Sequence, residues 1–230
     1  GDIMNNTIIQ ENSGLSSFYS KVYGFVGMGI AISALVSGLM LTTFQTALVE
    51  ILLHYSWIYY GAIFIELALV WSASSRGLRN SPAALPLFLS YSALNGFTMS
   101  FIVAMYTGGV VFKAFAVSAA VFLVMAAMGV IIKKDLSGMG RAMIAGLIGI
   151  VIASFVNIFL GSDMIDYIVS YVSVVIFAGL IAWDNQKIRY VYEQTGGQAG
   201  LGWAISLALS LYLDFINLFL SILRIFGRND

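Results

Sequence analysis

The sequence predicts an all-α integral membrane protein with seven transmembrane helices. Of its 230 residues, 60% are hydrophobic and 10% are charged, whereas soluble domains carry about 25% charged residues. The mean hydropathy is +0.93. Seven apolar stretches explain these values, each close to the roughly 20 residues that cross a bilayer as a helix. One membrane domain, residues 23–226, therefore accounts for nearly the whole chain.

The seven predicted spans are joined by short connections. They are Tyr23–Phe44, Tyr55–Ala73, Ala84–Tyr106, Val110–Ile132, Arg141–Leu160, Tyr167–Lys187 and Leu207–Phe226. Residues 1–22 are expected to form a mobile polar tail whose first three residues resemble a cloning remnant, and residues 227–230 form a short C-terminal tail. The first span is too long for a signal-peptide core, so we expect it to stay in the mature chain.

Positive charges predict the orientation of the spans. Eight lie in the N-terminal tail and in the second–third, fourth–fifth and sixth–seventh connections: Lys21, Arg76, Arg79, Lys133, Lys134, Arg141, Lys187 and Arg189. Three lie on the opposite side: Lys113, Arg224 and Arg228. Because positive residues concentrate in cytoplasmic connections, the N-terminus is expected in the cytoplasm and the C-terminus outside.

Composition also excludes several classes of function. The net charge is zero, so no nucleic-acid partner is expected. Without cysteine, the chain has no disulfide, thioether-linked haem or thiolate chemistry. The single histidine, His54, is expected in an outward loop and cannot build a metal site alone. We expect no enzymatic activity and no resident cofactor.

A polar stripe runs along the last predicted span. Its residues are spaced by four, four, three and four positions, which places them on one face of one helix: Ser206, Ser210, Asp214, Asn217 and Ser221. A carboxylate facing lipid costs about 2.5–3.5 kcal/mol on insertion scales. The stripe is therefore predicted to line a polar pathway, although serine and asparagine alone would be read as contacts between helices.

Three acids lie at or near membrane depth: Glu66, Asp184 and Asp214. If the spans end as predicted, Asp184 and Asp214 lie about 5 and 10 Å from the cytoplasmic ends of two successive helices, so their carboxyl groups can meet. Asp184 could instead be a solvated acid that pairs with Lys187 one turn later. Glu66 could line the pathway or be a protonated structural acid.

Two carboxyl groups in one dry site cannot both ionise cheaply and tend to share a proton. Asp184 and Asp214 are therefore predicted to act as a pH sensor and as calcium ligands. Calcium needs six to eight oxygens, so waters, hydroxyls or carbonyls such as those of Asn217 or Tyr212 would have to complete the site.

Two arginines follow the second span on the cytoplasmic side. Arg76 and Arg79 can serve only as topology signals, or one of them can form a charge-assisted pair with Asp184 that closes the pathway. Arg76 lies nearer the apolar segment and is the better candidate for this latch.

Small residues repeat along the fifth predicted span, at Ala142, Gly146, Gly149 and Ala153. Their spacing predicts a face that lets a neighbouring helix approach closely. No strand precedes Gly146 and no Lys-Ser/Thr pair follows, so these glycines are not a phosphate-binding loop.

Five blocks of sequence resemble the Bax-inhibitor (transmembrane Bax inhibitor motif) family. They are Lys133–Ser137, Ala145–Gly149, Val156–Leu160, Ala182–Ile188 and Leu211–Leu220, and the last two are the most specific. The resemblance implies a seven-helix bundle with the seventh helix central and a pH-sensitive calcium leak in a bacterial plasma membrane. It also implies that Asp184 and Asp214 form a di-aspartyl sensor and that an arginine after the second helix gates it. Trp183 stands where the family usually has tyrosine.

Two other classes of function compete with a leak. A regulator could bind another membrane protein, since some bacterial relatives in the resembled family are linked to a membrane-bound AAA protease. An intramembrane aspartyl protease also needs two aspartates on neighbouring helices, but Asp214 follows Tyr212-Leu213 rather than the Gly-x-Gly typical of those enzymes. A retinal protein is excluded because the seventh span contains no lysine for a Schiff base.

Overall fold

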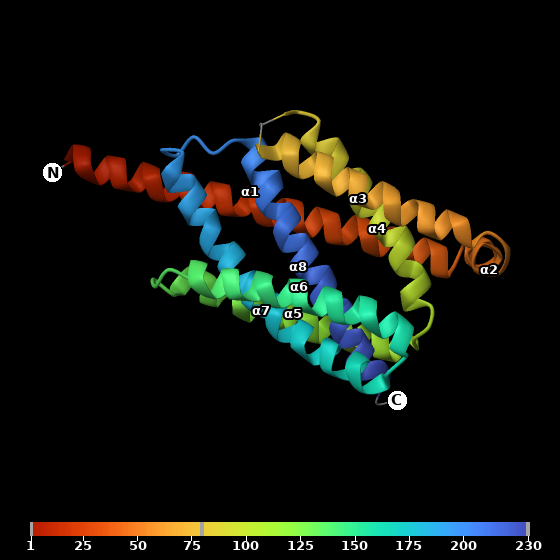
Figure 1. Ribbon diagram of the computed structural model, residues 1–230. Coiled ribbons are helices and arrows are strands. Elements are labelled where there is room, and N and C mark those ends of the chain that lie inside the picture. Colours follow the sequence, from red (N-terminus) through yellow and green to blue (C-terminus); the bar gives the residue numbers. More distant parts are fainter. Residues whose placement is uncertain (1, 79–80, 229–230) are drawn as a thin grey trace. The chain divides into compact units, whose positions relative to one another are not determined.

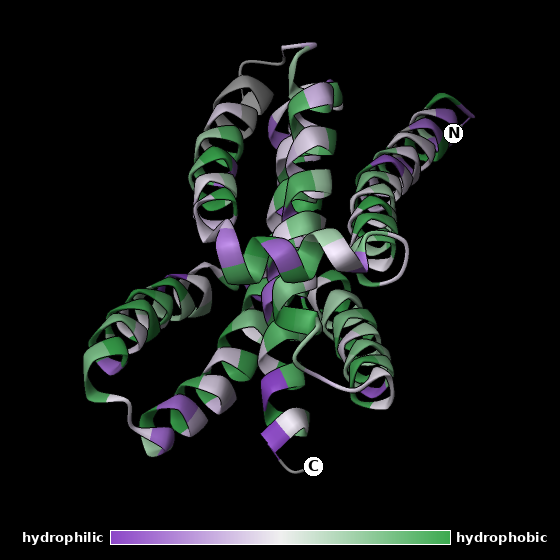
Figure 2. Cartoon of the chain, turned by 90° about the vertical axis from the view of Figure 1, so that its right-hand side faces the viewer, coloured by the Kyte–Doolittle hydropathy of each residue, from purple (hydrophilic) through white to green (hydrophobic). Residues whose placement is uncertain are grey.

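The computed structural model describes residues 2–78 and 81–228, without the side chains of residues 11, 71 and 73–78. The described chain is all-helical (Figure 1). Its helices are α1 (Asp2–Leu41), α2 (Gln45–His54), α3 (Ser56–Leu78), α4 (Ala84–Val103), α5 (Gly108–Ile131), α6 (Ser137–Leu160), α7 (Asp163–Gln194) and α8 (Leu201–Arg228). Figure 2 shows that apolar residues cover much of these helices.

Within the described chain, six helices are long and apolar enough to cross a membrane: α1, α4, α5, α6, α7 and α8. A seventh span requires α2 to be counted together with Ser56–Val70 of α3, and this pair is bent by 98°. The all-helical membrane architecture is therefore confirmed, while the count of seven and the central position of the last helix remain predictions.

The first part of the chain is more helical than expected at two places. The segment expected to be a mobile tail is part of α1, which runs without a break from Asp2 to Leu41, and its mobility stays a prediction. His54, expected in a loop, is the last residue of the ten-residue helix α2. Polar composition does not prevent a helix when an apolar span continues it, because each added residue gains a backbone hydrogen bond without a new nucleus.

Short polar turns fix several helix ends. Gly161 ends α6 in the left-handed conformation, with φ of 60°, and the side chain of Asn157 accepts a 2.8 Å hydrogen bond from the backbone N–H of Ser162. Before α6, the Oδ1 atom of Asp135 accepts hydrogen bonds from the N–H and the hydroxyl of Ser137. These bonds lower the pKa of Asp135, because they stabilise its ionised form.

The helices form two compact units, and α7 and α8 each contribute to both. The first unit contains Gly1–Met105 and Ile188–Tyr212, and the second contains Tyr106–Lys187 and Leu213–Asp230. Each unit has its own packing.

In the first unit, α4 packs against both α1 and α3. The hydroxyls of Ser33 and Ser37 on α1 donate to the backbone carbonyls of Ser92 and Gly96 on α4, at 2.7 and 2.6 Å. Gly96 is required at this crossing, because a Cβ there would lie 2.5 Å from the Ser33 carbonyl oxygen. Small residues thus let the two backbones approach and bond, as is common between membrane helices.

In the second unit, aromatic rings on α5 pack against α8. Phe215 makes edge contacts with Phe115 and Phe122, both with ring centroids 5.7 Å apart. Close approach between α5 and α7 occurs at Gly129, where a Cβ would lie 2.2 Å from the carbonyl oxygen of Ala182.

Among the described residues, no helix packs tightly on the predicted small-residue face of α6. Ala142 and Gly149 are exposed, and a Cβ at Gly149 would meet nothing within 4 Å. Gly146 only approaches the Ile176 side chain, at 3.0 Å. The prediction was wrong because spacing identifies a face of small residues but does not say whether a partner covers it.

Candidate functional site

Asp184 of α7 and Asp214 of α8 come together inside the second unit. Each is only 6% exposed, and their carboxyl groups lie within hydrogen-bonding distance of each other. The Oδ2 atom of Asp214 is buried and has no hydrogen-bond partner among the described residues. A buried polar atom without a partner is rare in folded proteins and is often found where a proton or an ion acts.

A lysine completes this acidic site at its rim. The Lys187 ammonium lies 3.1 Å from Oδ1 of Asp184 and 3.4 Å from the ring centroid of Trp183. The indole fits because the neighbouring helix has Gly140, where a Cβ would lie 2.1 Å from the Trp183 ring. The tryptophan thus holds the lysine over Asp184 through a cation–π contact.

A glutamine two residues after Asp184 fastens α7 to the connection between α5 and α6. The Gln186 Oε1 atom accepts from the backbone N–H of Leu136 at 2.8 Å. Its Nε2 atom donates to the carbonyls of Lys134 and Ile132, at 2.8 and 3.2 Å. One amide side chain therefore satisfies three backbone groups of a connection that lies outside the helices, and it fixes the turn of α7 that carries Asp184.

This clamp predicts a difference between two substitutions of similar size. Gln186→Glu keeps the acceptor for Leu136 but cannot donate to the two carbonyls, so we expect a loss of about 1–3 kcal/mol in unfolding free energy. Gln194→Glu, at the exposed end of the same helix, serves as the control and should change little. Thermal unfolding in detergent measures both, and equal stability of the two variants would show that the clamp does not support the fold.

The remaining residues of the polar stripe are divided between the two units. Ser206 and Ser210 lie in the first unit, whereas Asn217 and Ser221 lie in the second. Ser210, Asn217 and Ser221 donate to backbone carbonyls four residues earlier in α8. Asn217 and Ser221 also line a cavity of about 220 Å³ in the second unit, together with Ser173. A pore-lining role for the stripe stays a prediction.

Two other candidates lie in the first unit. Glu66 is half-buried on α3 and accepts a hydrogen bond from the hydroxyl of Thr98 on α4. Tyr212, which we considered as a calcium ligand, is fully buried, and its hydroxyl is hydrogen-bonded to Ser33 and, at 2.9 Å, to Asn95. The Tyr212 hydroxyl is therefore already hydrogen-bonded within the first unit.

The predicted latch falls beyond what the structure describes. The backbone of Arg76 belongs to α3, but its side chain is outside the described residues, and Arg79 is outside them altogether. Among the described residues, no group of three or more His, Cys, Asp or Glu side chains could hold a metal ion.

Comparison with known proteins identifies the family. The profile described as "Inhibitor of apoptosis-promoting Bax1" matches residues 15–230. The chain belongs to the Bax inhibitor-1 family. It is 57% identical over 229 residues to an "uncharacterized membrane protein" of Streptococcus pyogenes serotype M1, covering 99% of this chain and 100% of the relative.

Two further relatives extend the family relationship. YrjE of Lactococcus lactis is 46% identical, over 97% of this chain and 96% of the relative. "Inner membrane protein YbhL" of Escherichia coli is 39% identical with the same coverage. This Bax inhibitor-1 family member is accordingly a membrane protein, as its apolar helices indicate.

The sequence alone did not identify every residue around the acidic site of this Bax inhibitor-1 family member. The spacing of Lys187 from Asp184 suggested an ion pair as the alternative to an approach to Asp214, whereas in the structure Asp184 lies next to both residues. Gln186 gave no signal, because its partners are backbone groups about fifty residues earlier.

Proposed function

We propose that this protein is a passive, pH-sensitive calcium leak of the bacterial plasma membrane, gated by Asp184 and Asp214 and without enzymatic activity. One observation carries the proposal: two buried carboxyl groups contact each other, and one oxygen of the pair has no partner among the described residues. Buried charges persist only when they are paired or neutralised. The pair is therefore suited to hold a proton or a cation.

The charge of the surrounding group supports the sharing of one proton. Lys187 contributes one positive charge at the rim, so the group is neutral when the two carboxyl groups hold one proton between them. Removing that proton leaves two adjacent negative charges with one cation, and the repulsion drives α7 and α8 apart near Asp214. Adding a second proton removes the negative charge that pairs with the Lys187 ammonium.

Calcium is the permeating ion that these oxygens favour. Carboxylates are its preferred charged ligands, and neutral oxygens complete its shell. Asn217 lies three residues after Asp214 on the same helix face, and its amide donates through Nδ2, which leaves its carbonyl oxygen for an ion. In this proposal Glu66, Ser206, Ser210, Asn217 and Ser221 line the pathway in the open state.

Calcium flux into liposomes that contain only this protein tests the proposal. We expect flux that needs no energy source and that changes with pH when it is measured from about pH 5 to 9, because two carboxyl groups in one dry site tend to share a proton. Flux that is constant across this range would exclude proton gating. No flux at any pH would instead favour a regulator that acts by binding another membrane protein, and cleavage of a helical substrate would favour a protease.

The latch gives a separate prediction. If Arg76 pairs with Asp184 in the closed state, Arg76→Ala removes a charge-assisted contact of about 1.5–3 kcal/mol. The open-to-closed ratio then rises about tenfold or more, and basal calcium leak rises with it. Arg79→Ala is the control. A raised leak in the control alone would mean that Arg79 is the latch, and no change in either variant would restrict both arginines to setting orientation.

A further inference from the structure

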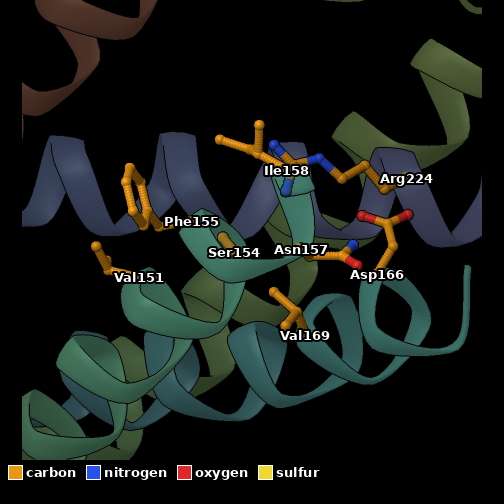
Figure 3. A pocket seen from close by; sticks show the side chains of 8 residues that line it. All are labelled: Val151, Ser154, Phe155, Asn157, Ile158, Asp166, Val169 and Arg224. Carbon is orange, nitrogen blue, oxygen red and sulfur yellow. The ribbon is translucent and has the colours of Figure 1, made fainter. Parts of the chain in front are cut away.

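A second cavity lies within the second unit, near the beginning of α7 and the end of α8. It has a volume of about 590 Å³ and is lined by α6, α7 and α8 (Figure 3). We call it the α6–α8 cleft. Its lining residues are Val151, Ser154, Phe155, Asn157, Ile158, Asp166, Val169 and Arg224. The volume is typical of sites for small molecules.

Among the described residues, one cation of the cleft has no charged or hydrogen-bonded partner. Asp166 is paired with Arg228, whose guanidinium lies 2.7 Å from its carboxylate and also donates to the Asp163 carbonyl. Arg224, one turn earlier on α8, makes no hydrogen bond or ion pair with the described residues. Figure 3 shows its guanidinium reaching from α8 over the end of α6 toward Ile158. An anion in the cleft would therefore meet a guanidinium that is not already neutralised.

The opposite wall of the cleft is apolar and exposed. Val151, Phe155 and Ile158 on α6 are 60%, 62% and 75% exposed, and no residue in the most apolar stretch of α6 is buried. From Ile158, near the end of α6, to Val151, nearer its middle, these residues extend over about 10 Å of the helix. Arg224 lies near the end of α8. In a membrane protein such a face lies against acyl chains, while the helix ends lie at the level of the headgroups.

We propose that the α6–α8 cleft binds an anionic phospholipid, with the headgroup phosphate on Arg224 and an acyl chain along Val151 and Phe155. A guanidinium binds phosphate oxygens in a bidentate manner and is less strongly hydrated than an ammonium. Ser154 is a further polar residue in the lining of the cleft. The cleft adjoins the 220 Å³ cavity at Asn217 and Ser221, because Val151, Ser154, Val169 and Arg224 line both. The lipid would thus cover the end of the polar stripe.

Native mass spectrometry of the full-length protein in detergent, with phosphatidylglycerol added, tests the site without reference to calcium. Wild-type protein should retain phosphatidylglycerol, and Arg224→Gln should lower the affinity about tenfold, the loss expected for a charge-assisted contact. Arg224→Lys should lie between the two. Lys113→Gln is the matched control, since Lys113 is an exposed cation of the same unit that does not line the cleft.

The apolar wall has its own test and control. Phe155→Ala should weaken retention several-fold, while Phe112→Ala, which removes another exposed ring, on α5, should not. Circular dichroism verifies that each variant is folded. Equal retention by wild type and Arg224→Gln would overturn the proposal, as would equal retention of phosphatidylcholine. If inorganic phosphate alone displaced the lipid at millimolar concentration, the cleft would be a simple anion site and the proposal would also fail.

Discussion

Asp214→Asn is expected to produce a folded protein whose calcium leak no longer depends on pH. Asparagine has nearly the same shape as aspartate but stays neutral. The substitution therefore removes the Asp214 carboxyl group from the pair without opening a cavity. Asp184→Asn should have the same effect, because a shared proton belongs to both carboxyl groups rather than to one. Flux into liposomes across about pH 5 to 9 is the measurement.

The double variant and a surface acid provide the controls. If the two aspartates act as one unit, Asp184→Asn combined with Asp214→Asn should differ little from either single variant, which is the signature of coupled residues. Asp163→Asn removes an exposed carboxylate from the same α7 helix and should leave the profile intact. Independent, additive effects of the two single changes would show that the carboxyl groups do not share a proton.

The proximity of these aspartates could be predicted although the helix ends could not. The predicted sixth span ended at Lys187 and the last span began at Leu207, whereas α7 continues to Gln194 and α8 begins at Leu201. The two errors are seven and six residues (194 − 187 and 207 − 201) and largely cancel. Asp184 and Asp214 therefore lie about 15 and 20 Å from the ends of their helices, again at matching depth.

The sequence did not predict the full extent of α1, the short helix α2 or the packing partners of the glycines. The polar segment before Tyr23 was expected to be a tail and is helical, and α2 was not foreseen because its ten residues are too few for a span. The small residues of α6 formed the clearest packing pattern, yet Gly149 faces open space. The sequence did not single out Gly96 or Gly129, and only the structure shows the backbone that approaches each of them.

Gly129 therefore gives the second large prediction. Gly129→Ala would place a Cβ 2.2 Å from the carbonyl oxygen of Ala182 and 3.0 Å from the Cβ of Asn185. The first of these is a backbone atom in the middle of α7, so a side-chain rotation cannot relieve the clash and the two helices must move apart. Such overpacking costs about 1–3 kcal/mol, and we expect thermal unfolding in detergent at a clearly lower temperature.

The same substitution should also disturb the proposed sensor, because Ala182 and Asn185 lie on either side of Asp184 in the sequence. Moving α7 away from α5 shifts Asp184 relative to Asp214, so the pH transition of calcium flux should move or broaden. Gly149→Ala adds a methyl group to open space on α6 and should alter neither property, or slightly stabilise the helix. If Gly129→Ala unfolds at the wild-type temperature, the α5–α7 crossing is looser than described. If it is destabilised but keeps the wild-type pH transition, then the Gln186 clamp and the α8 contacts, rather than the close approach at Gly129, hold Asp184 in place.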